Sequence, residues 1–469
     1  MGEHYAPTLR GASSNAWRGS TSSRPPPAVN SLPEPPMHAS RLATTSRLAA
    51  VALSVAFVAC SDQAADPLAP SAIRSANAEG FEALGVFQRY YSIGTSISGG
   101  VTSDGLKAAS QQTSWVAQLA NLAKRPMTLP LISGFGCGSL LKAPLALGVR
   151  ESGEPAGASL LQRQCAPNED GVQLPTQNLA IDGANTDEAL HATPESPDPS
   201  HAPQYSRILP PGKSQVTALE ELNAKLVSVE LGGNDILGAR YGVYPSATEV
   251  VPVAVWEPQY REVIRRVAAV TKEAVLVGLL NDVRSFPSFR TGDEIYQARA
   301  TFAPFNVIVS SNCENSTNLI FVAVRVPVAA ATGAAYAANQ LGPYTFSCQN
   351  APSFTNIQDY VLDANDVAGV NAQLAAMNAV IQDEAAKHGF AYFPLGALYE
   401  DVVTKAPFNA VTLMTSQQPY GPYISLDGIH PTAEGSRVLA DAAAQALNNT
   451  YNLGIPLSGG PSLALFTQQ

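Results

Sequence analysis

The chain has 469 residues, of which 45% are hydrophobic and 14% are charged, and its net charge is −10 at pH 7. This length allows one to three domains, and the composition excludes a coiled coil, a collagen-like chain and a wholly disordered chain. The acidic balance argues against a nucleic-acid-binding protein, because such proteins neutralise phosphates with a basic surface.

The first 80 residues are typical of a segment that carries an export signal ahead of a folded domain. Residues 1–36 have no periodic apolar pattern and are expected to be disordered; with Met37 as the expected true start, they would not be translated. Residues 37–59 combine two arginines with a twelve-residue apolar stretch, which is typical of a secretory signal and too short to span a membrane. Residues 60–80 would then form a short tether.

Cys60 follows this apolar stretch directly. The segment Phe57-Val58-Ala59-Cys60 resembles a bacterial lipobox, although Leu is usual where Phe57 stands. The resemblance implies that Cys60 is acylated and that the exported protein meets the membrane through its lipid anchor alone. Ser61, instead of Asp, implies the outer membrane. Ordinary signal cleavage beside an unmodified Cys60 is the alternative.

Four further cysteines are expected to be oxidised in an exported protein. They are Cys137, Cys165, Cys313 and Cys348. Four cysteines allow three connectivities. Pairing each cysteine with its sequence neighbour is favoured because each bond would bracket a loop-rich stretch, and four free thiols are the alternative. No two cysteines have CxxC spacing, so we expect no zinc site.

From residue 81 onward, strand patterns alternate with helix patterns. Strands are expected at residues 87–93, 227–231, 274–279 and 390–393. Helices are expected at residues 110–123, 218–226, 260–270, 367–381 (with Gly389 as the cap) and 432–447. A further apolar run at 319–326 should stop at Pro327. This alternation predicts an α/β fold with a parallel sheet covered by helices.

No internal repeat or clean linker divides this region. We therefore expect one domain at residues 81–450, a C-terminal tail at 451–469 and a monomeric protein. Two long insertions interrupt the pattern, near 134–215 and near 282–360. The insertion near 134–215 is expected to be loop-like and proline-rich, and the other is expected to be irregular at 282–318 and 340–360. Loops of this length are usually functional or disordered.

Four short polar segments stand out along the chain. They are residues 94–100 and 231–235, each after an expected strand, residues 427–432, which enter an expected helix, and residues 181–185. In an open parallel sheet, active sites lie beyond the carboxyl ends of the strands. Ser96 and Asn234 are both expected there, so they are candidates for a shared site.

A serine nucleophile needs a base, and histidine is suited to accept its proton near neutral pH. His430 follows Asp427 by three residues, in a loop that enters a helix, and Asp427 can accept the Nδ1–H of His430. His201 also follows an aspartate by three residues but lies in the proline-rich insertion, so His430 is favoured. The backbone N–H groups of Ser96 and Gly183 and the side-chain amide of Asn234 are candidate oxyanion donors.

These segments resemble the SGNH (GDSL) hydrolase family over residues ~85–445, above all Gly-Gly-Asn-Asp at 232–235 and Asp-Gly-Ile-His-Pro-Thr at 427–432. The resemblance implies a flavodoxin-like three-layer fold with helices on both faces of the sheet. It also implies that Ser96 is the nucleophile, His430 its base and Asp427 the partner of His430. The oxyanion donors would be Ser96, Gly183 and Asn234, with no cofactor and no metal.

One residue departs from the family pattern. The family usually has Asp where this chain has Thr95, which puts the hydrogen bonding of the nucleophile turn in doubt. Ser98 is a rival nucleophile. It also stands where the α/β-hydrolase pattern Gly-x-Ser-x-Gly requires glycine, which argues against that fold. Glu230, in an apolar strand, has no explanation from sequence.

The sequence therefore predicts an exported serine esterase or lipase that cleaves carboxylic esters through an acyl-enzyme on Ser96. Its substrate would be a small-molecule or lipid ester, with no nucleic-acid partner. The alternative is a non-catalytic surface lipoprotein that uses the same fold as a binding module, and its support is Thr95 in the nucleophile turn.

Overall fold

The computed structural model describes residues 84–136, 138–157, 165–196, 202–242, 244, 250–350 and 358–459. Cys60, Cys137, His201 and the expected signal and tether segments lie outside the described residues. Among the helices of the described residues, none is long and apolar enough to cross a membrane.

The centre of the fold is a four-stranded parallel sheet with the strand order β1-β2-β3-β9. The strands are β1 (Tyr90–Gly94), β2 (Leu226–Glu230), β3 (Glu273–Gly278) and β9 (Ala391–Pro394). Strand β1 begins three residues later than expected, because Leu84–Arg89 forms a 3₁₀ helix and pairing with β2 starts at Tyr90 opposite Leu226. All four strands run the same way, so their carboxyl ends share one edge.

Both faces of the sheet are buried, which explains the nearly continuous apolar runs in its strands. In β3, the side chains of Ala274 and Leu276 join one hydrophobic cluster, and those of Val275 and Val277 join the other. This separation follows from the two-residue alternation of a strand.

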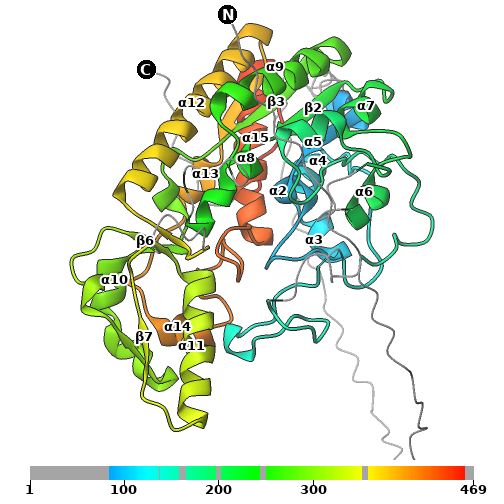
Figure 1. Cartoon of the computed structure of the whole chain (residues 1–469). Helices are drawn as coiled ribbons and strands as arrows, with labels where there is room; N and C mark the ends of the chain where they lie inside the picture. Colours follow the sequence, from blue (N-terminus) through cyan, green and yellow to red (C-terminus); the bar gives the residue numbers. More distant parts are fainter. Residues whose placement is uncertain are drawn as a thin grey trace, which may run out of the picture. The chain divides into compact units, whose positions relative to one another are not determined.

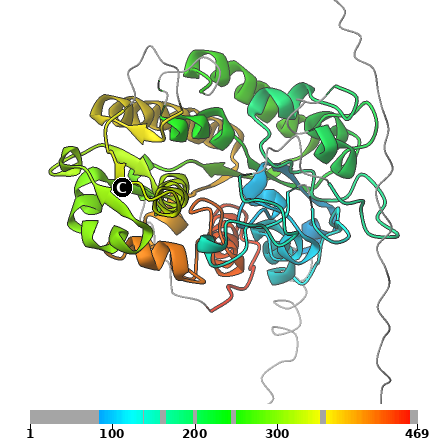
Figure 2. The same ribbon diagram turned by 60° about the horizontal axis from the view of Figure 1, so that its bottom comes forward.

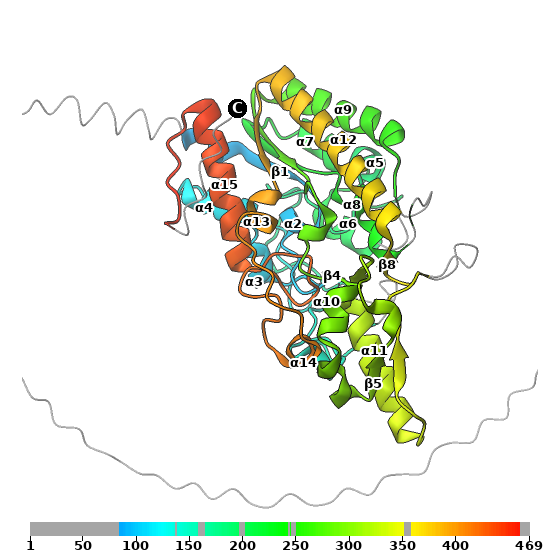
Figure 3. The ribbon, with the colours of Figure 1, turned by 90° about the vertical axis from the view of Figure 1, so that its left-hand side faces the viewer.

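Helices cover each face of the sheet, as Figure 3 shows. On one face pack α4 (Trp115–Leu122), α13 (Gly396–Tyr399) and α15 (Ala433–Tyr451). On the other pack α5 (Thr186–His191), α7 (Gln215–Glu220), α9 (Val253–Val270) and α12 (Ala364–His388). The predicted α/β fold, with helices on both faces of a parallel sheet, is confirmed.

Two helix ends show how single residues decide the boundaries. The helix expected at residues 110–123 is split into α3 (Ala108–Gln112) and α4, because Ser114 leaves the helical conformation and its hydroxyl accepts the N–H of Ala117. Helix α12 ends as predicted at Gly389, whose φ of 66° lies in the left-handed region that favours glycine.

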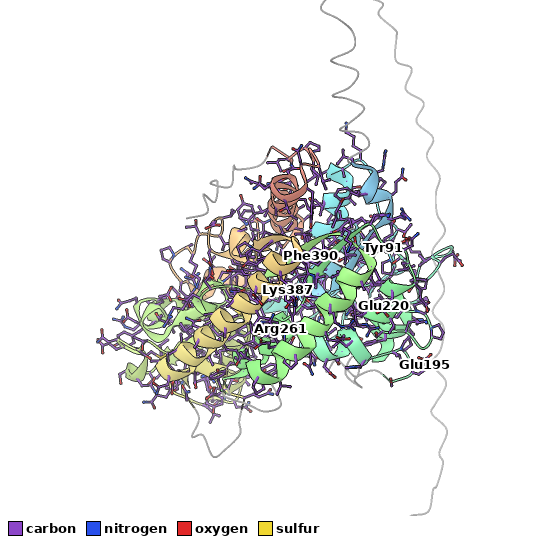
Figure 4. All side chains as sticks on the ribbon, turned by 90° about the horizontal axis from the view of Figure 1, so that it is seen from above. Tyr91, Glu195, Glu220, Arg261, Lys387 and Phe390 are labelled. Carbon is purple, nitrogen blue, oxygen red and sulfur yellow. A yellow bond between two sulfur atoms is a disulfide. The ribbon has the colours of Figure 1, made fainter. Side chains whose placement is uncertain are left out.

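Ion pairs join α9 to α12 on the outer surface. Arg261 on α9 contacts Asp383 at 2.7 Å and also the carboxylate of Glu384 on α12. Lys387 contacts Glu384 at 3.2 Å. Figure 4 shows Arg261 and Lys387 on these neighbouring helices. Glu384 is fully buried, so these cations offset the cost of burying its charge.

The insertion near 282–360 contains a lobe with its own helices and strands, between β3 and α12 (Figure 1, Figure 2). We call its described residues, 289–350 and 358–362, the inserted lobe. Its antiparallel sheet contains β4 (Phe289–Thr291), β6 (Leu319–Phe321) and β8 (Val361–Leu362). Strands β5 (Val307–Val309) and β7 (Tyr344–Phe346) pair separately, and α10 (Gly292–Gln297) and α11 (Val322–Ala338) complete it. The expectation of irregular structure was wrong for residues 282–318, which contain β4, α10 and β5. Among residues 340–350 and 358–360 only β7 is regular, so there the expectation is largely confirmed.

The apolar run at residues 319–326 does not stop at Pro327. It begins as β6 and continues into α11, and Pro327 lies inside that helix. A proline there removes the hydrogen bond to the carbonyl of Ala323. The helix continues because the sequence after Pro327 is rich in alanine, the strongest helix former.

The insertion near 134–215 is also less loop-like than expected, since it contains α5 and α6 (Ala202–Ile208). In addition, residues 177–181 run parallel to β1. Ser92 N–H donates to the Gln177 carbonyl at 2.9 Å, and Ile181 N–H donates to the Gly94 carbonyl at 3.1 Å. This pairing carries the chain to the carboxyl end of β1 just before Gly183.

Cys313 and Cys348 form the predicted disulfide, which lies in the inserted lobe. Cys165 is also disulfide-bonded; its expected partner Cys137 lies outside the described residues. The alternative of four free thiols is therefore wrong.

Replacing Cys313 and Cys348 together with serine is expected to lower the free energy of unfolding by about 4 kcal/mol, because the bond closes a long loop in the unfolded chain. The two cysteines are 35 positions apart. Chemical denaturation of the variant and the wild-type chain, both oxidised, measures the difference. Since Cys165 keeps its own bond, an unchanged midpoint would contradict a stabilising role for the Cys313–Cys348 bond alone.

Candidate active site

Ser96 stands directly beyond the carboxyl end of β1. The strand ends at Gly94, Thr95 is extended, and the short helix α2 (Ser96–Gly99) begins at Ser96. The Ser96 side chain is nearly buried, and it lies at the sheet edge where the sequence predicted it.

Asp427 and His430 come from the loop between α14 (Ala410–Thr415) and α15. Ser425 N–H donates to the His430 carbonyl at 2.9 Å, which closes the loop. Gly428 has a φ of 72°, and a Cβ added there would lie 2.4 Å from the Cβ of Ser288. Only glycine fits this turn, so Gly428 sets the direction in which the two candidate side chains leave the loop.

A continuous hydrogen-bond chain joins the three candidate side chains. His430 Nε2 lies 2.8 Å from Ser96 Oγ, and His430 Nδ1 lies 2.7 Å from Asp427 Oδ2. Asp427 Oδ1 accepts the backbone N–H groups of Ile429 at 2.8 Å and His430 at 2.9 Å. The structure thus brings together residues that are 334 positions apart in sequence.

This arrangement shifts both ionisable groups. Burial alone would raise the pKa of Asp427, but His430 and the backbone donors outweigh burial and lower that pKa to about 2. Burial alone would lower the pKa of His430, but the Asp427 carboxylate outweighs it and raises that pKa above the usual 6.5. Asp427 is therefore ionised near neutral pH, and the imidazole of His430 is a stronger base than usual.

A second loop holds the aspartate from outside the sequence motifs. Asp104 N–H donates to Asp427 Oδ2, and Ser103 N–H donates to Ser425 Oγ at 2.7 Å. The almost fully buried guanidinium of Arg150 contacts the Asp104 carboxylate and donates to its carbonyl at 2.9 Å. Sequence reasoning missed Asp104 and Arg150, because no motif or periodicity marks a contact between two loops.

Asn234 lies in α8 (Gly233–Leu237), directly after β2, and lines a pocket together with Ser96. Its side-chain amide donates to the Ala184 carbonyl at 3.0 Å. Since an amide nitrogen carries two N–H groups, this bond uses only one of them. The bond also fixes Asn234 to the residue that follows Gly183.

Gly183 has a φ of 76°, which favours glycine. The neighbouring Asp235 ties α8 to the same loop, because it accepts the Thr186 N–H at 3.1 Å and its hydroxyl at 2.8 Å. Burial outweighs these bonds and raises the pKa of Asp235 to about 6. Ser96, Gly183 and Asn234 therefore stand on segments that converge at one edge of the sheet.

The other candidates do not join this site. Ser98 is fully buried, and its hydroxyl accepts the indole N–H of Trp115 at 3.1 Å. A substrate cannot reach Ser98, which removes the rival nucleophile. Among the described residues, no three His, Cys, Asp or Glu side chains are grouped as a metal site requires.

An apolar pocket opens at Ser96. It extends between α2, α8, the residues after β3 and α12, with Ile97, Ile236, Leu279, Phe286 and Leu374 in its wall. Its cavity volume is about 70 Å³, well below the ~300–1,000 Å³ typical of sites that enclose a whole ligand. The pocket therefore suits one small apolar part of a substrate.

Comparisons with known proteins give the family. Residues 90–443 match the model of the GDSL-like lipase/acylhydrolase family, whereas no curated protein matches the chain. A mutant acetyl-xylooligosaccharide esterase from Geobacillus is 12% identical over 76% of this chain and 93% of its own, with a TM-score of 0.32. An extracellular lipase from Streptomyces rimosus is 14% identical over 77% of this chain and 98% of its own, with a TM-score of 0.30. Because the family match spans well over half of its residues, the chain belongs to the GDSL-like lipase/acylhydrolase family.

Proposed function

We propose that this protein is an exported serine esterase that hydrolyses carboxylic esters through an acyl-enzyme on Ser96. The observation that carries the proposal is the hydrogen-bond chain from Ser96 Oγ through His430 to the Asp427 carboxylate. An esterase of this type needs no metal, because the nucleophile is activated by a neighbouring base.

In the first half-reaction, Ser96 Oγ attacks the ester carbonyl while His430 Nε2 takes the hydroxyl proton. Asp427 accepts the Nδ1–H of His430 and stabilises the imidazolium. The tetrahedral oxyanion accepts hydrogen bonds from the backbone N–H groups of Ser96 and Gly183 and from the Asn234 amide. The intermediate then collapses, and the alcohol leaves with the proton from His430.

In the second half-reaction, a water molecule gives a proton to His430 and attacks the acyl carbonyl. The second tetrahedral intermediate uses the same oxyanion donors. Its collapse releases the carboxylic acid and returns the proton to Ser96 Oγ. The small apolar pocket beside Ser96 would hold the acyl group, so we propose that short acyl chains are preferred.

Hydrolysis of p-nitrophenyl esters from C2 to C16 by residues 61–469 with oxidised cysteines tests the activity. The same sample is treated with an organophosphonate, and the adduct is located by peptide mass spectrometry. We expect turnover that is highest for short chains and an adduct on Ser96. A folded sample without turnover or adduct would contradict the esterase and favour the binding-module alternative.

The pH dependence follows from His430. The raised pKa contributes stability below pH 6.5 that is lost as pH rises through the folded-state pKa. Only the neutral imidazole accepts the Ser96 proton, and the pKa of His430 is raised above 6.5, so kcat/KM should fall on acidification with a midpoint above pH 6.5. A pH–rate profile measures this midpoint. The exposed His191 provides a control, since His191→Asn should leave the profile unchanged.

We further propose that Cys60 carries a lipid that anchors the protein to the outer membrane. The proposal is supported by the lipobox-like segment and by Ser61. In a bacterial host, the wild-type chain should sediment with membranes and incorporate labelled palmitate, and Cys60→Ser should do neither. Labelling that persists in the variant would contradict the proposal.

A further inference from the structure

Glu230 is a buried carboxylate that the proposed mechanism does not use. It is the last residue of β2, its side chain is only 3% exposed, and it lies opposite Gly94 in the β1–β2 pairing. Burial raises the pKa of Glu230, while its hydrogen bonds from Thr95 and Ser98 oppose that rise. A buried carboxylate costs free energy, so its contacts need an explanation.

Within the described part of the chain, the hydrogen bonds of this carboxylate go to the turn that carries Ser96. Glu230 Oε2 accepts the N–H of Thr95 at 3.0 Å and the N–H of Ser98 at 3.2 Å. The Thr95 hydroxyl donates to Oε1 at 2.8 Å. The two N–H groups belong to residues on either side of Ser96, so Glu230 fixes the turn both before and after the nucleophile.

This pattern is that of a helix cap supplied from another strand. The residue before a helix usually accepts the N–H of the third helical residue with its own side chain. In α2 those residues are Thr95 and Ser98, but the Thr95 side chain makes no capping bond. The carboxylate of Glu230 accepts the Ser98 N–H in its place. An aspartate at position 95, as is usual in the family, would be able to cap the turn from within.

We propose that Glu230 is a positioning residue for Ser96, whose carboxylate caps the nucleophile turn from β2 and replaces the acceptor that Thr95 does not provide. The proposal rests on the proposed role of Ser96 as nucleophile. It accounts for both features that the sequence left unexplained, Thr95 in the first motif and Glu230 in an apolar strand.

The cap matters because Ser96 must satisfy two geometries at once. Its hydroxyl must stay near His430 Nε2, now 2.8 Å away, and its N–H must point at the oxyanion. Without the carboxylate, the N–H groups of Thr95 and Ser98 would be buried without an acceptor. The turn would shift to satisfy them, and a shift of about 1 Å can cost about 100-fold in rate.

A double-mutant cycle over positions 95 and 230 tests the proposal. The variants are Glu230→Ala, Thr95→Asp and the two combined, with kcat divided by the number of sites titrated with organophosphonate. Glu230→Ala should lose about 100-fold in kcat with KM little changed. Thr95→Asp should also lose activity, because two buried carboxylates would compete for the same donors.

The combined variant should recover at least about tenfold over either single variant, since the aspartate then caps the turn alone. Losses that simply multiply in the combined variant would overturn the proposal. So would a Glu230→Ala protein with full kcat per titrated site, since that is the result expected for a merely structural residue.

Glu230→Gln separates the hydrogen-bond acceptor from the charge and guards against misfolding of Glu230→Ala. The amide oxygen can still accept both N–H groups, and its NH₂ can donate to the Thr95 hydroxyl. This variant should keep most of the wild-type kcat. A folded Glu230→Gln protein as inactive as Glu230→Ala would overturn the cap as the explanation.

Thermal unfolding of the wild-type chain and the three variants of the cycle measures the coupling without any activity. We expect the combined variant to unfold at a higher temperature than either single variant. A wild-type chain that shows no turnover and no adduct on Ser96 would contradict the proposed function alone. Additive shifts in unfolding temperature would contradict the role of Glu230 alone.

Discussion

Replacing Ser96 with alanine is expected to lower kcat for p-nitrophenyl esters by about 10⁴- to 10⁶-fold, because no acyl-enzyme can form. The substitution removes one hydroxyl and its hydrogen bond to His430, at 2.8 Å. The backbone N–H at position 96 stays in place, so substrate binding and the oxyanion donors should be little affected. Steady-state kinetics together with the organophosphonate adduct measure the effect.

Ser152→Ala is the matched control, since Ser152 is exposed and lies away from the pocket that opens at Ser96. It should retain the wild-type kcat. Full activity in Ser96→Ala would show that another residue, or a contaminating enzyme, performs the hydrolysis. An unchanged unfolding temperature for Ser96→Ala is expected, and it shows that a lost activity reports chemistry and not folding.

Asp427→Asn is expected to lower kcat by about 10³- to 10⁴-fold with KM little changed. The asparagine oxygen can still accept the N–H groups of Ile429 and His430, which Asp427 Oδ1 accepts at 2.8 and 2.9 Å. Its NH₂ group, however, cannot accept the Nδ1–H of His430. His430 would then adopt the other tautomer, in which Nε2 carries the proton. In that tautomer Nε2 cannot accept the proton of Ser96.

The pH profile gives a second measurement on Asp427→Asn. The Asp427 carboxylate raises the pKa of His430, so its removal should move the acid midpoint of the residual activity to lower pH. Asp187→Asn is the matched control because it removes an exposed aspartate–histidine pair, 3.1 Å apart, outside the site. A midpoint that stays in place in Asp427→Asn would contradict the link between these two residues.

The sheet could be predicted from sequence because its strands are buried on both faces and form largely apolar runs that end at or near a glycine. The end of α12 at Gly389 was predictable for a similar local reason. The inserted lobe was not, since its strands are two or three residues long and gain stability only by pairing across the lobe. The expectation of a stop at Pro327 was wrong because the helix propensity of the alanine-rich sequence after it outweighs the cost of one proline in α11.

The residues of the candidate site also divide into those that the sequence predicts and those that it does not. The segments around Ser96, Asn234 and His430 could be recognised because each places polar residues beside glycine in a short motif, and because these motifs resemble those of the family. The contacts of Glu230 and Arg150 could not be recognised. Glu230 contacts residues 132 to 135 positions away in the sequence. Arg150 contacts Asp104 on another loop. Such contacts are set by the completed fold, and no short pattern encodes them.

The long separation between Ser96 and His430 also has a consequence for the time at which the protein becomes active. In the proposed mechanism the nucleophile Ser96 is synthesised early, but its base His430 is 334 positions further along. In between lie the inserted lobe and β9, which must find its place beside β3. A growing or truncated chain that ends before residue 430 therefore carries a serine without its base. Under the proposed mechanism, hydrolytic activity therefore requires a folded chain that extends through His430.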